Sequence, residues 1–194
     1  MVESPAEFNK NRVKGDNAES VFSFLIESLG EWEIIKYGIE NHIHVLKNSL
    51  KGDYSDTAEK IRSMPDYAII NKKENKVMLF EVKRISFIDK RKPDQMLFRF
   101  KKGIIERYIK YWGEAKLFIV QPAYPFFYLI DVKDIDIKKH RSRVSFRSEK
   151  ELDGHINPIQ WWNFKDIQYD VKKLFPTLKD ETIEVATKDM ILPS

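Results

Sequence analysis

The chain has 194 residues, of which 42% are hydrophobic, so it is long enough for one ordinary domain with a substantial core. It contains no cysteine, which excludes disulfides and thiolate metal sites, and no apolar run long enough to cross a membrane. The first residues also lack the apolar segment of a signal peptide, so we expect a soluble, cytoplasmic protein with no membrane partner.

Charge is distributed unevenly along the chain, although the net charge is only +4. Residues 16–66 contain ten acidic and five basic residues, whereas residues 83–116 contain four acidic and eleven basic residues. Residues 138–150 add one acidic and six basic residues. Acidic and basic stretches together favour a polyanionic partner next to a site that uses carboxylates. Either stretch alone would be typical of a solvated surface.

The predicted elements begin after a loose N-terminal arm at residues 1–13. The next segment, "KGDNAESVFSFLIESLG", carries apolar residues at helical spacing. We expect an amphipathic helix that is capped by Asp16 and ends at Gly30. The stretch "EWEIIKYGI" then alternates as a strand does, and residues 41–63 are polar and mixed, which predicts an insertion with a short helix.

The remaining elements predict an α/β fold. Strands are expected at about 67–71 and 76–83, and a second helix at about 94–112. The segments "KLFIVQP" and "FFYLIDV" are further strands. This order indicates a central mixed β-sheet flanked by helices, with a core domain at 14–130. Residues 131–194 are expected to be a C-terminal extension packed on that core.

The hairpin around "NKKENK" sets two acids against each other. A loop of two or four residues centred between Lys73 and Glu74 pairs positions whose numbers sum to 147, so Asp66 faces Glu81. Opposed side chains have Cβ atoms about 5 Å apart, and two carboxylates at that range repel by on the order of 3 kcal/mol at an effective dielectric near 20. Both faces of the hairpin are otherwise apolar, so the repulsion implies that a cation sits between the acids.

A divalent cation suits this pair of acids. Mg²⁺ and Mn²⁺ take oxygen ligands and are commonly held by one or two carboxylates with waters and substrate phosphate. Lys83 points to the same face as Glu81, where it could position or deprotonate a metal-bound water, or stabilise developing charge on a phosphate. The sequence leaves open whether Lys83 acts as a base or only as an electrostatic aid. Glu19, at the rim of the first helix's apolar face, is a candidate third acid. The structural alternative is a surface hairpin end with a Glu81–Lys83 contact and a solvated Asp66.

These residues resemble the PD-(D/E)XK nuclease superfamily. Pro65–Asp66 and Glu81–Val82–Lys83 match the two halves of its defining motif, and Glu19 matches the acid on its first helix. Within the superfamily, the sequence is most similar to archaeal Holliday junction resolvases and related small nucleases. Their helix after the Glu-X-Lys strand opens with a glutamine, and Gln95 fits that place.

The resemblance implies a restriction-endonuclease-like core and metal-dependent hydrolysis of nucleic-acid phosphodiesters. Asp66, Glu81 and the Val82 carbonyl would hold Mg²⁺ or Mn²⁺, with Glu19 as a direct or water-mediated ligand. Lys83 would orient the nucleophile, and Gln95 would support the site. Residues 41–63 and 122–194 depart from the compact resolvases, and the substrate of such nucleases is chosen in regions of this kind.

Basic residues supply candidate contacts to nucleic acid. Gln95, Arg99 and Lys102 would share one polar stripe of the second helix, unless that stripe is an ordinary solvated face. The segment "KKHRSRVSFR" alternates basic and apolar residues, as an edge strand or flap would. The expected nucleic-acid contacts are Lys14, Arg84, Arg99, Lys102, Lys139, Arg141 and Arg143.

The sequence therefore favours a Mg²⁺- or Mn²⁺-dependent endonuclease that acts on branched or duplex DNA. A homodimer would allow two strands to be cut symmetrically. One alternative is a non-catalytic DNA-binding module that keeps the nuclease fold. Another is a nuclease with a different task, namely restriction-like cleavage, exonuclease action or RNA cleavage.

Overall fold

The computed structural model describes residues 5–38, 49–50, 52–84, 97–120, 126–135, 159–163 and 171–191. Side chains are described in the same ranges except at 5–15, 97–103, 105 and 159–163. Among these residues no helix is both long enough and apolar enough to form a membrane span.

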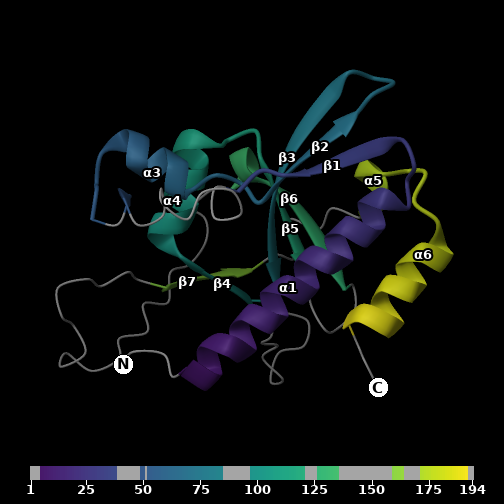
Figure 1. Cartoon of the computed structure of the whole chain (residues 1–194), viewed down its shortest axis with the longest axis horizontal. Helices are drawn as coiled ribbons and strands as arrows, with labels where there is room; N and C mark the ends of the chain where they lie inside the picture. Colours follow the sequence, from purple (N-terminus) through teal and green to yellow (C-terminus); the bar gives the residue numbers. More distant parts are fainter. Residues whose placement is uncertain are drawn as a thin grey trace.

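A five-stranded mixed sheet forms the centre of the molecule (Figure 1). The strands lie in the order β1-β2-β3-β5-β6, with β3 and β5 parallel and the other neighbours antiparallel. Their bounds are β1 Trp32–Lys36, β2 Tyr67–Asn71, β3 Lys76–Arg84, β5 Lys116–Val120 and β6 Phe127–Asp131. The predicted α/β class and mixed sheet are thus confirmed.

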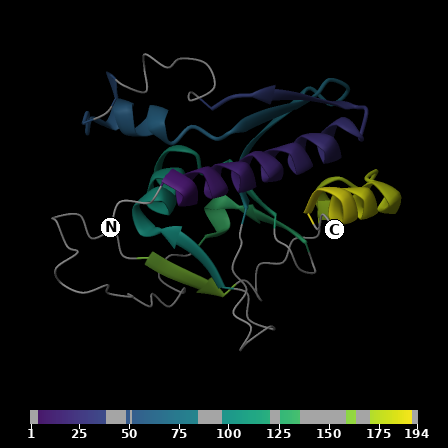
Figure 2. The ribbon, with the colours of Figure 1, turned by 60° about the horizontal axis from the view of Figure 1, so that its bottom comes forward.

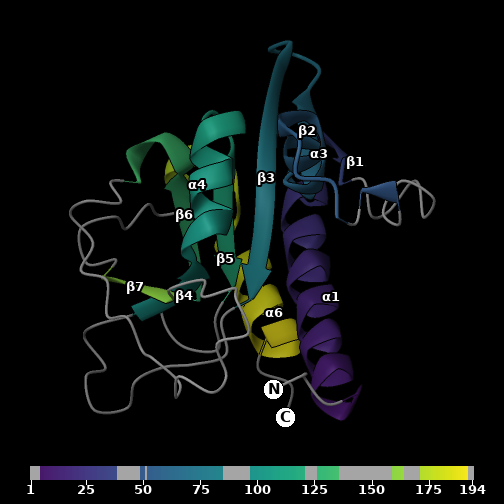
Figure 3. The ribbon, with the colours of Figure 1, turned by 90° about the vertical axis from the view of Figure 1, so that its left-hand side faces the viewer.

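Helices cover both faces of this sheet (Figure 3). One face packs against α1 (Pro5–Glu27), and the opposite face packs against α4 (Lys102–Tyr111). A short helix, α3 (Asp56–Arg62), lies beside α4 and begins at Ser55, whose hydroxyl accepts a hydrogen bond from the Ala58 amide at 3.2 Å. The short helix expected between 41 and 63 is therefore present as α3.

The core beneath α1 is built around Phe22. Its ring centroid lies 5.0 Å from those of Phe80 and Phe118 and 5.3 Å from that of Tyr67. Contacts between tilted aromatic rings at this spacing add to the free energy gained by burying their area. Phe22 therefore ties α1 to strands β2, β3 and β5.

The C-terminal part of the described chain packs on the same core. It contains α5 (Val171–Leu174), α6 (Asp180–Val185), and η5 (Ala186–Ile191), which is a π-helix that runs beside α1 (Figure 2). A short helical turn, η2 (Val132–Asp134), follows β6. The buried hydrophobic residues that this part contributes to the core are Val171, Phe175, Leu178, Ala186 and Ile191.

The hairpin register agrees with the prediction. Tyr67 pairs with Phe80 and Ile70 with Val77, so partner numbers sum to 147. The turn is closed by Asn71, whose side-chain oxygen accepts hydrogen bonds from two turn amides at 3.0 and 3.1 Å. Continuing this register by one residue sets Asp66 opposite Glu81.

Two boundaries differ from expectation. The first helix begins at Pro5, so the arm expected at 1–13 is mostly helical and Asp16 lies inside the helix instead of capping it. Proline suits a first helical position because its missing N–H would have no intrahelical partner there. The predicted end holds, since Gly30 follows the helix with a φ of 68°.

The second helix starts eight residues later than the expected 94. Residues Leu97–Lys101 instead form β4, which pairs antiparallel with β7 (Ile159–Asn163) in a separate two-stranded sheet (Figure 3). The segment "LFRFK" alternates aromatic or aliphatic residues with basic ones, and this period suits a strand better than a helix. The prediction that Arg99 and Lys102 share one polar stripe of the second helix is therefore wrong, because Arg99 lies in β4 and Lys102 begins α4.

Candidate active site

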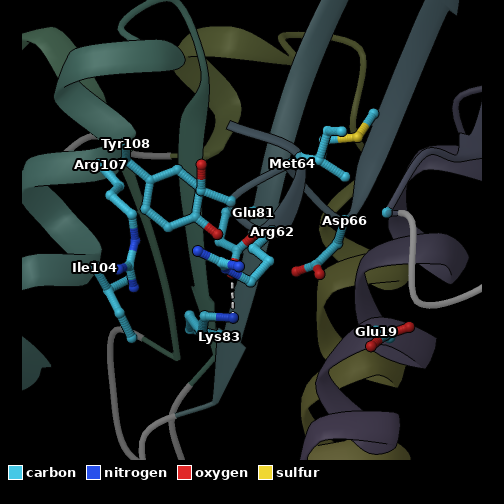
Figure 4. Close-up of a pocket in the computed structure, with 12 residues that line it drawn as sticks. Glu19, Arg62, Met64, Asp66, Glu81, Lys83, Ile104, Arg107 and Tyr108 are labelled. Atoms are coloured by element: carbon cyan, nitrogen blue, oxygen red, sulfur yellow. Dashed lines mark ion pairs between the residues drawn. The ribbon is translucent and has the colours of Figure 1, made fainter. Parts of the chain in front are cut away.

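A cavity of about 280 Å³ opens at the end of the β2–β3 hairpin that lies opposite its turn (Figure 4). Its walls come from α1, the end of α3, the start of β2, strand β3 and α4. The polar and charged side chains among its lining are Glu19, Arg62, Ser63, Asp66, Glu81, Lys83, Arg107 and Tyr108. The cavity therefore brings four of the sequence-predicted site residues together, namely Glu19, Asp66, Glu81 and Lys83.

Asp66 is held in place by backbone groups on both sides. Its carbonyl accepts hydrogen bonds from the amides of Tyr37 at 2.8 Å and Gly38 at 3.1 Å, just past the end of β1. Its carboxylate Oδ2 accepts a hydrogen bond from the Val82 amide at 2.8 Å. Asp66 is thus fixed between two strands, and its carboxyl group points toward Glu81 and Lys83 (Figure 4).

The two opposed carboxyl groups act on each other. Burial, followed by the negative charge of Glu81, raises the pKa of Asp66 from 3.8 to about 7, although Lys83 and the Val82 amide act in the opposite direction. Glu81 is only 3% exposed, and its Oε2 accepts no hydrogen bond of ordinary geometry from the described residues, although the Tyr108 hydroxyl interacts with the same carboxylate. A buried carboxylate oxygen without a donor is costly, so this oxygen is available to a ligand that brings positive charge.

Lys83 forms an ion pair with Glu81 Oε1 (Figure 4). Both residues alternate along β3 with Phe80 and Val82, which pack under α1, so they point to the α4 face. Burial lowers the pKa of Lys83, but Glu81 and Asp66 outweigh that effect and raise it to about 12. With a side chain 39% exposed to the cavity, Lys83 presents an ammonium cation at neutral pH.

Glu19 lines the cavity but is bound to other partners. Its Oε2 accepts a hydrogen bond from the Tyr67 hydroxyl at 2.9 Å and lies 3.8 Å from Lys36 Nζ. Burial, and then this bond to Glu19, raise the pKa of Tyr67. Over the described ranges, no three histidine or acidic side chains lie close enough to hold one ion. Glu19 therefore stands apart from the Asp66–Glu81 pair in this structure.

The other predicted residues lie in several places. Lys14 is in α1, Arg99 is in β4 and Lys102 begins α4, with side chains outside the described set. Arg84 donates a hydrogen bond to the side-chain oxygen of Asn17 and does not line the cavity. Four predicted residues lie outside the described residues altogether, namely Gln95, Lys139, Arg141 and Arg143.

Four polar or charged residues of the cavity have no role predicted from the sequence, namely Arg62, Ser63, Arg107 and Tyr108. Tyr108 belongs to the apolar side of α4 and is buried beside Glu81; burial, and then the Glu81 charge, raise its pKa. Arg107 lies next to it on α4, and Arg62 ends α3. Tyr108 could have been identified from the sequence, because its hydroxyl lies on the otherwise apolar side of the second helix. The two arginines gave no such signal, because their positions depend on how α3 and α4 pack.

In chemical terms, the site offers two adjacent carboxylates, a buried carboxylate oxygen that the described residues leave without a donor, and a lysine cation at the cavity. This donor set suits a hard divalent cation such as Mg²⁺ or Mn²⁺, which is often held by two carboxylates with waters completing the shell.

Comparison with models of protein families gives no match, and comparison with curated proteins gives none either.

Proposed function

We propose that this chain is a metal-dependent nuclease that hydrolyses DNA phosphodiester bonds, with a restriction-endonuclease-like core. The observation that carries the proposal is the Asp66–Glu81 pair, in which burial and like charge raise the pKa of Asp66 to about 7 while one Glu81 oxygen has no donor among the described residues. Carboxylates forced together in this way favour a bound cation. The Pro65–Asp66 and Glu81–Val82–Lys83 motif agrees with this interpretation.

Asp66 and Glu81 are the residues that would hold Mg²⁺ or Mn²⁺. When bound, the cation would neutralise charge on the scissile phosphate and polarise it toward attack. The Val82 amide holds the Asp66 carboxylate in place, which orients the ligand before substrate arrives.

Lys83 has an electrostatic role in this proposal. Because its pKa is raised to about 12, it keeps its proton at neutral pH and is a poor general base. Its ammonium group is suited to stabilise the negative charge that builds up on the phosphate oxygens during attack. A metal bound between the two acids would also compete with Lys83 for Glu81, which would free the ammonium group for the substrate.

The substrate expected from the resemblance is branched DNA cut by a structure-selective endonuclease, with a homodimer cutting two strands. End-labelled single-stranded, duplex, flap and four-way-junction DNA would be incubated with Mg²⁺, Mn²⁺ or chelator. Metal-dependent cutting by wild type and by Asp53→Ala, but not by Asp66→Ala, is the expected result. Asp53 is the matched control because it is exposed and does not line the cavity.

A second candidate is a DNA-binding module that keeps the nuclease fold without cutting. It is favoured by the partners that the acids already have, since Glu81 pairs with Lys83 and Glu19 with Tyr67 and Lys36. Calorimetric titration with Mn²⁺ separates the two candidates. The nuclease proposal predicts binding that is lost in Asp66→Ala, whereas a binding module requires no such binding.

A further inference from the structure

Two arginines face the cavity from different helices. Arg107 comes from α4 and Arg62 from the end of α3, and both line the cavity that contains the acid pair (Figure 4). Arg107 is half-buried, yet the described residues include no carboxylate or carbonyl bonded to it. A half-buried arginine with no anionic partner among the described residues is open to an anion that enters the cavity, because desolvated guanidinium groups are normally paired.

The relative position of these arginines is fixed by contacts between α3 and α4. Asp56 accepts hydrogen bonds from Lys110 at 2.8 Å and from the Tyr111 hydroxyl at 3.0 Å. The Trp112 indole N–H lies 3.3 Å from the Ser63 hydroxyl, which it can reach as a donor. Arg62 also donates a hydrogen bond to the Leu50 carbonyl. Contacts outside the cavity thus fix α3, which carries Arg62, and α4, which carries Arg107, relative to each other.

The charges of the cavity favour an anion once a metal is present. Three acids, Glu19, Asp66 and Glu81, face three cations, Arg62, Lys83 and Arg107. The formal charge of this set is zero, so one divalent cation would leave a net charge of +2. Guanidinium groups match the paired oxygens of a phosphate better than a point charge does.

We propose that Arg107, together with Arg62 from the end of α3, binds the phosphodiester backbone of DNA and positions it over the Asp66–Glu81 pair. This inference rests on the proposed function for the identity of the substrate. Both arginines are positioning residues, because they hold the phosphate while the acids and Lys83 do the chemistry. Arg107 is the better test, since Arg62 is also engaged with Leu50.

The test measures binding and cleavage of a fluorescein-labelled DNA duplex and of its single strand. Binding is followed by anisotropy with Ca²⁺, which takes the same kind of oxygen ligands, at several salt concentrations. The proteins are wild type, Arg107→Gln, Arg107→Lys and Lys73→Gln. Lys73 is the charge-matched control because it is exposed in the β2–β3 turn and does not line the cavity.

Arg107→Gln is expected to raise Kd and KM about tenfold, with kcat changed less than about threefold, and to reduce the salt slope by about one unit. Arg107→Lys should recover part of the affinity, which a purely structural role would not explain. Equal affinities and slopes in Arg107→Gln and Lys73→Gln would overturn the inference. If wild type cuts no DNA but the affinity loss persists, the nuclease proposal fails while the phosphate-binding role of Arg107 stands.

Discussion

Replacing Asp66 by asparagine is expected to stabilise the metal-free protein at alkaline pH, although it removes a proposed metal ligand. Burial and then Glu81 raise the pKa of Asp66 from 3.8 to about 7. The pKa of Asp66 therefore differs by about three units between the folded and unfolded states, and each unit corresponds to about 1.4 kcal/mol. Keeping Asp66 ionised costs the folded state up to about 4 kcal/mol. Asparagine is neutral, and its side-chain oxygen can still accept the Val82 N–H.

The direction in which stability changes with pH follows from proton binding. Because the folded-state pKa lies above the unfolded value, the folded protein binds more protons between about pH 4 and pH 7, and its stability falls as pH rises through that window. The penalty is nearly absent below pH 4 and complete above pH 7. Urea unfolding in chelator should therefore show Asp66→Asn more stable than wild type by about 2–4 kcal/mol near pH 8.5, and by less than about 1 kcal/mol near pH 4.

Asp53→Asn provides the control for this measurement. Asp53 is exposed, and the Ser55 backbone amide holds its pKa below the usual range, so removing its charge should not stabilise the protein near pH 8.5. Saturating Mn²⁺ should stabilise wild type but not Asp66→Asn, by about 2.7 kcal/mol at a hundredfold excess over Kd. Equal stability of wild type and Asp66→Asn across the whole pH range would refute the description of two carboxylates forced together.

Three further outcomes are expected. Lys83→Gln should retain Mn²⁺ binding by calorimetry but lose cleavage by about a hundredfold, because the cation beside the phosphate is gone; cleavage at the wild-type rate would contradict its role. Cleavage at limiting Mn²⁺ should rise with pH toward about 7, as Asp66 becomes available as a ligand, and a flat rate–pH profile would argue against Asp66 binding the metal. Phe22→Ala should lower the free energy of unfolding by about 3–5 kcal/mol, measured by urea titration, since the ring touches three buried aromatic residues; a loss under about 1 kcal/mol would show that Phe22 does not link α1 to the sheet.

The hairpin and its acid pair could be predicted because they depend on local pattern. The centre of the turn fixes the register, and the register alone sets Asp66 opposite Glu81. Strands β5 and β6 could be predicted equally well, because each is a continuous apolar run bounded by turns.

The predictions fail where one sequence pattern is compatible with two structures, or where the packing of helices decides which side chains meet. Helical spacing predicts a helix over 94–112, but Leu97–Lys101 forms a strand with β7, a partner about sixty residues away in sequence. The cavity residues Arg107 and Tyr108 depend on how α4 packs against the sheet and α3. The hydroxyl on the apolar side of α4 pointed to Tyr108, but no pattern within α4 pointed to Arg107.

The most direct measurement of the central claim is the single-turnover rate of DNA cleavage with and without Mn²⁺ for wild type, Asp66→Asn and Asp53→Asn. DNA binding would be recorded under the same conditions. Mn²⁺-dependent cutting is expected from wild type and Asp53→Asn, and no cutting is expected from an Asp66→Asn protein that still folds and binds DNA. Cutting by Asp66→Asn at the wild-type rate, or wild-type cutting that persists in chelator, would contradict it.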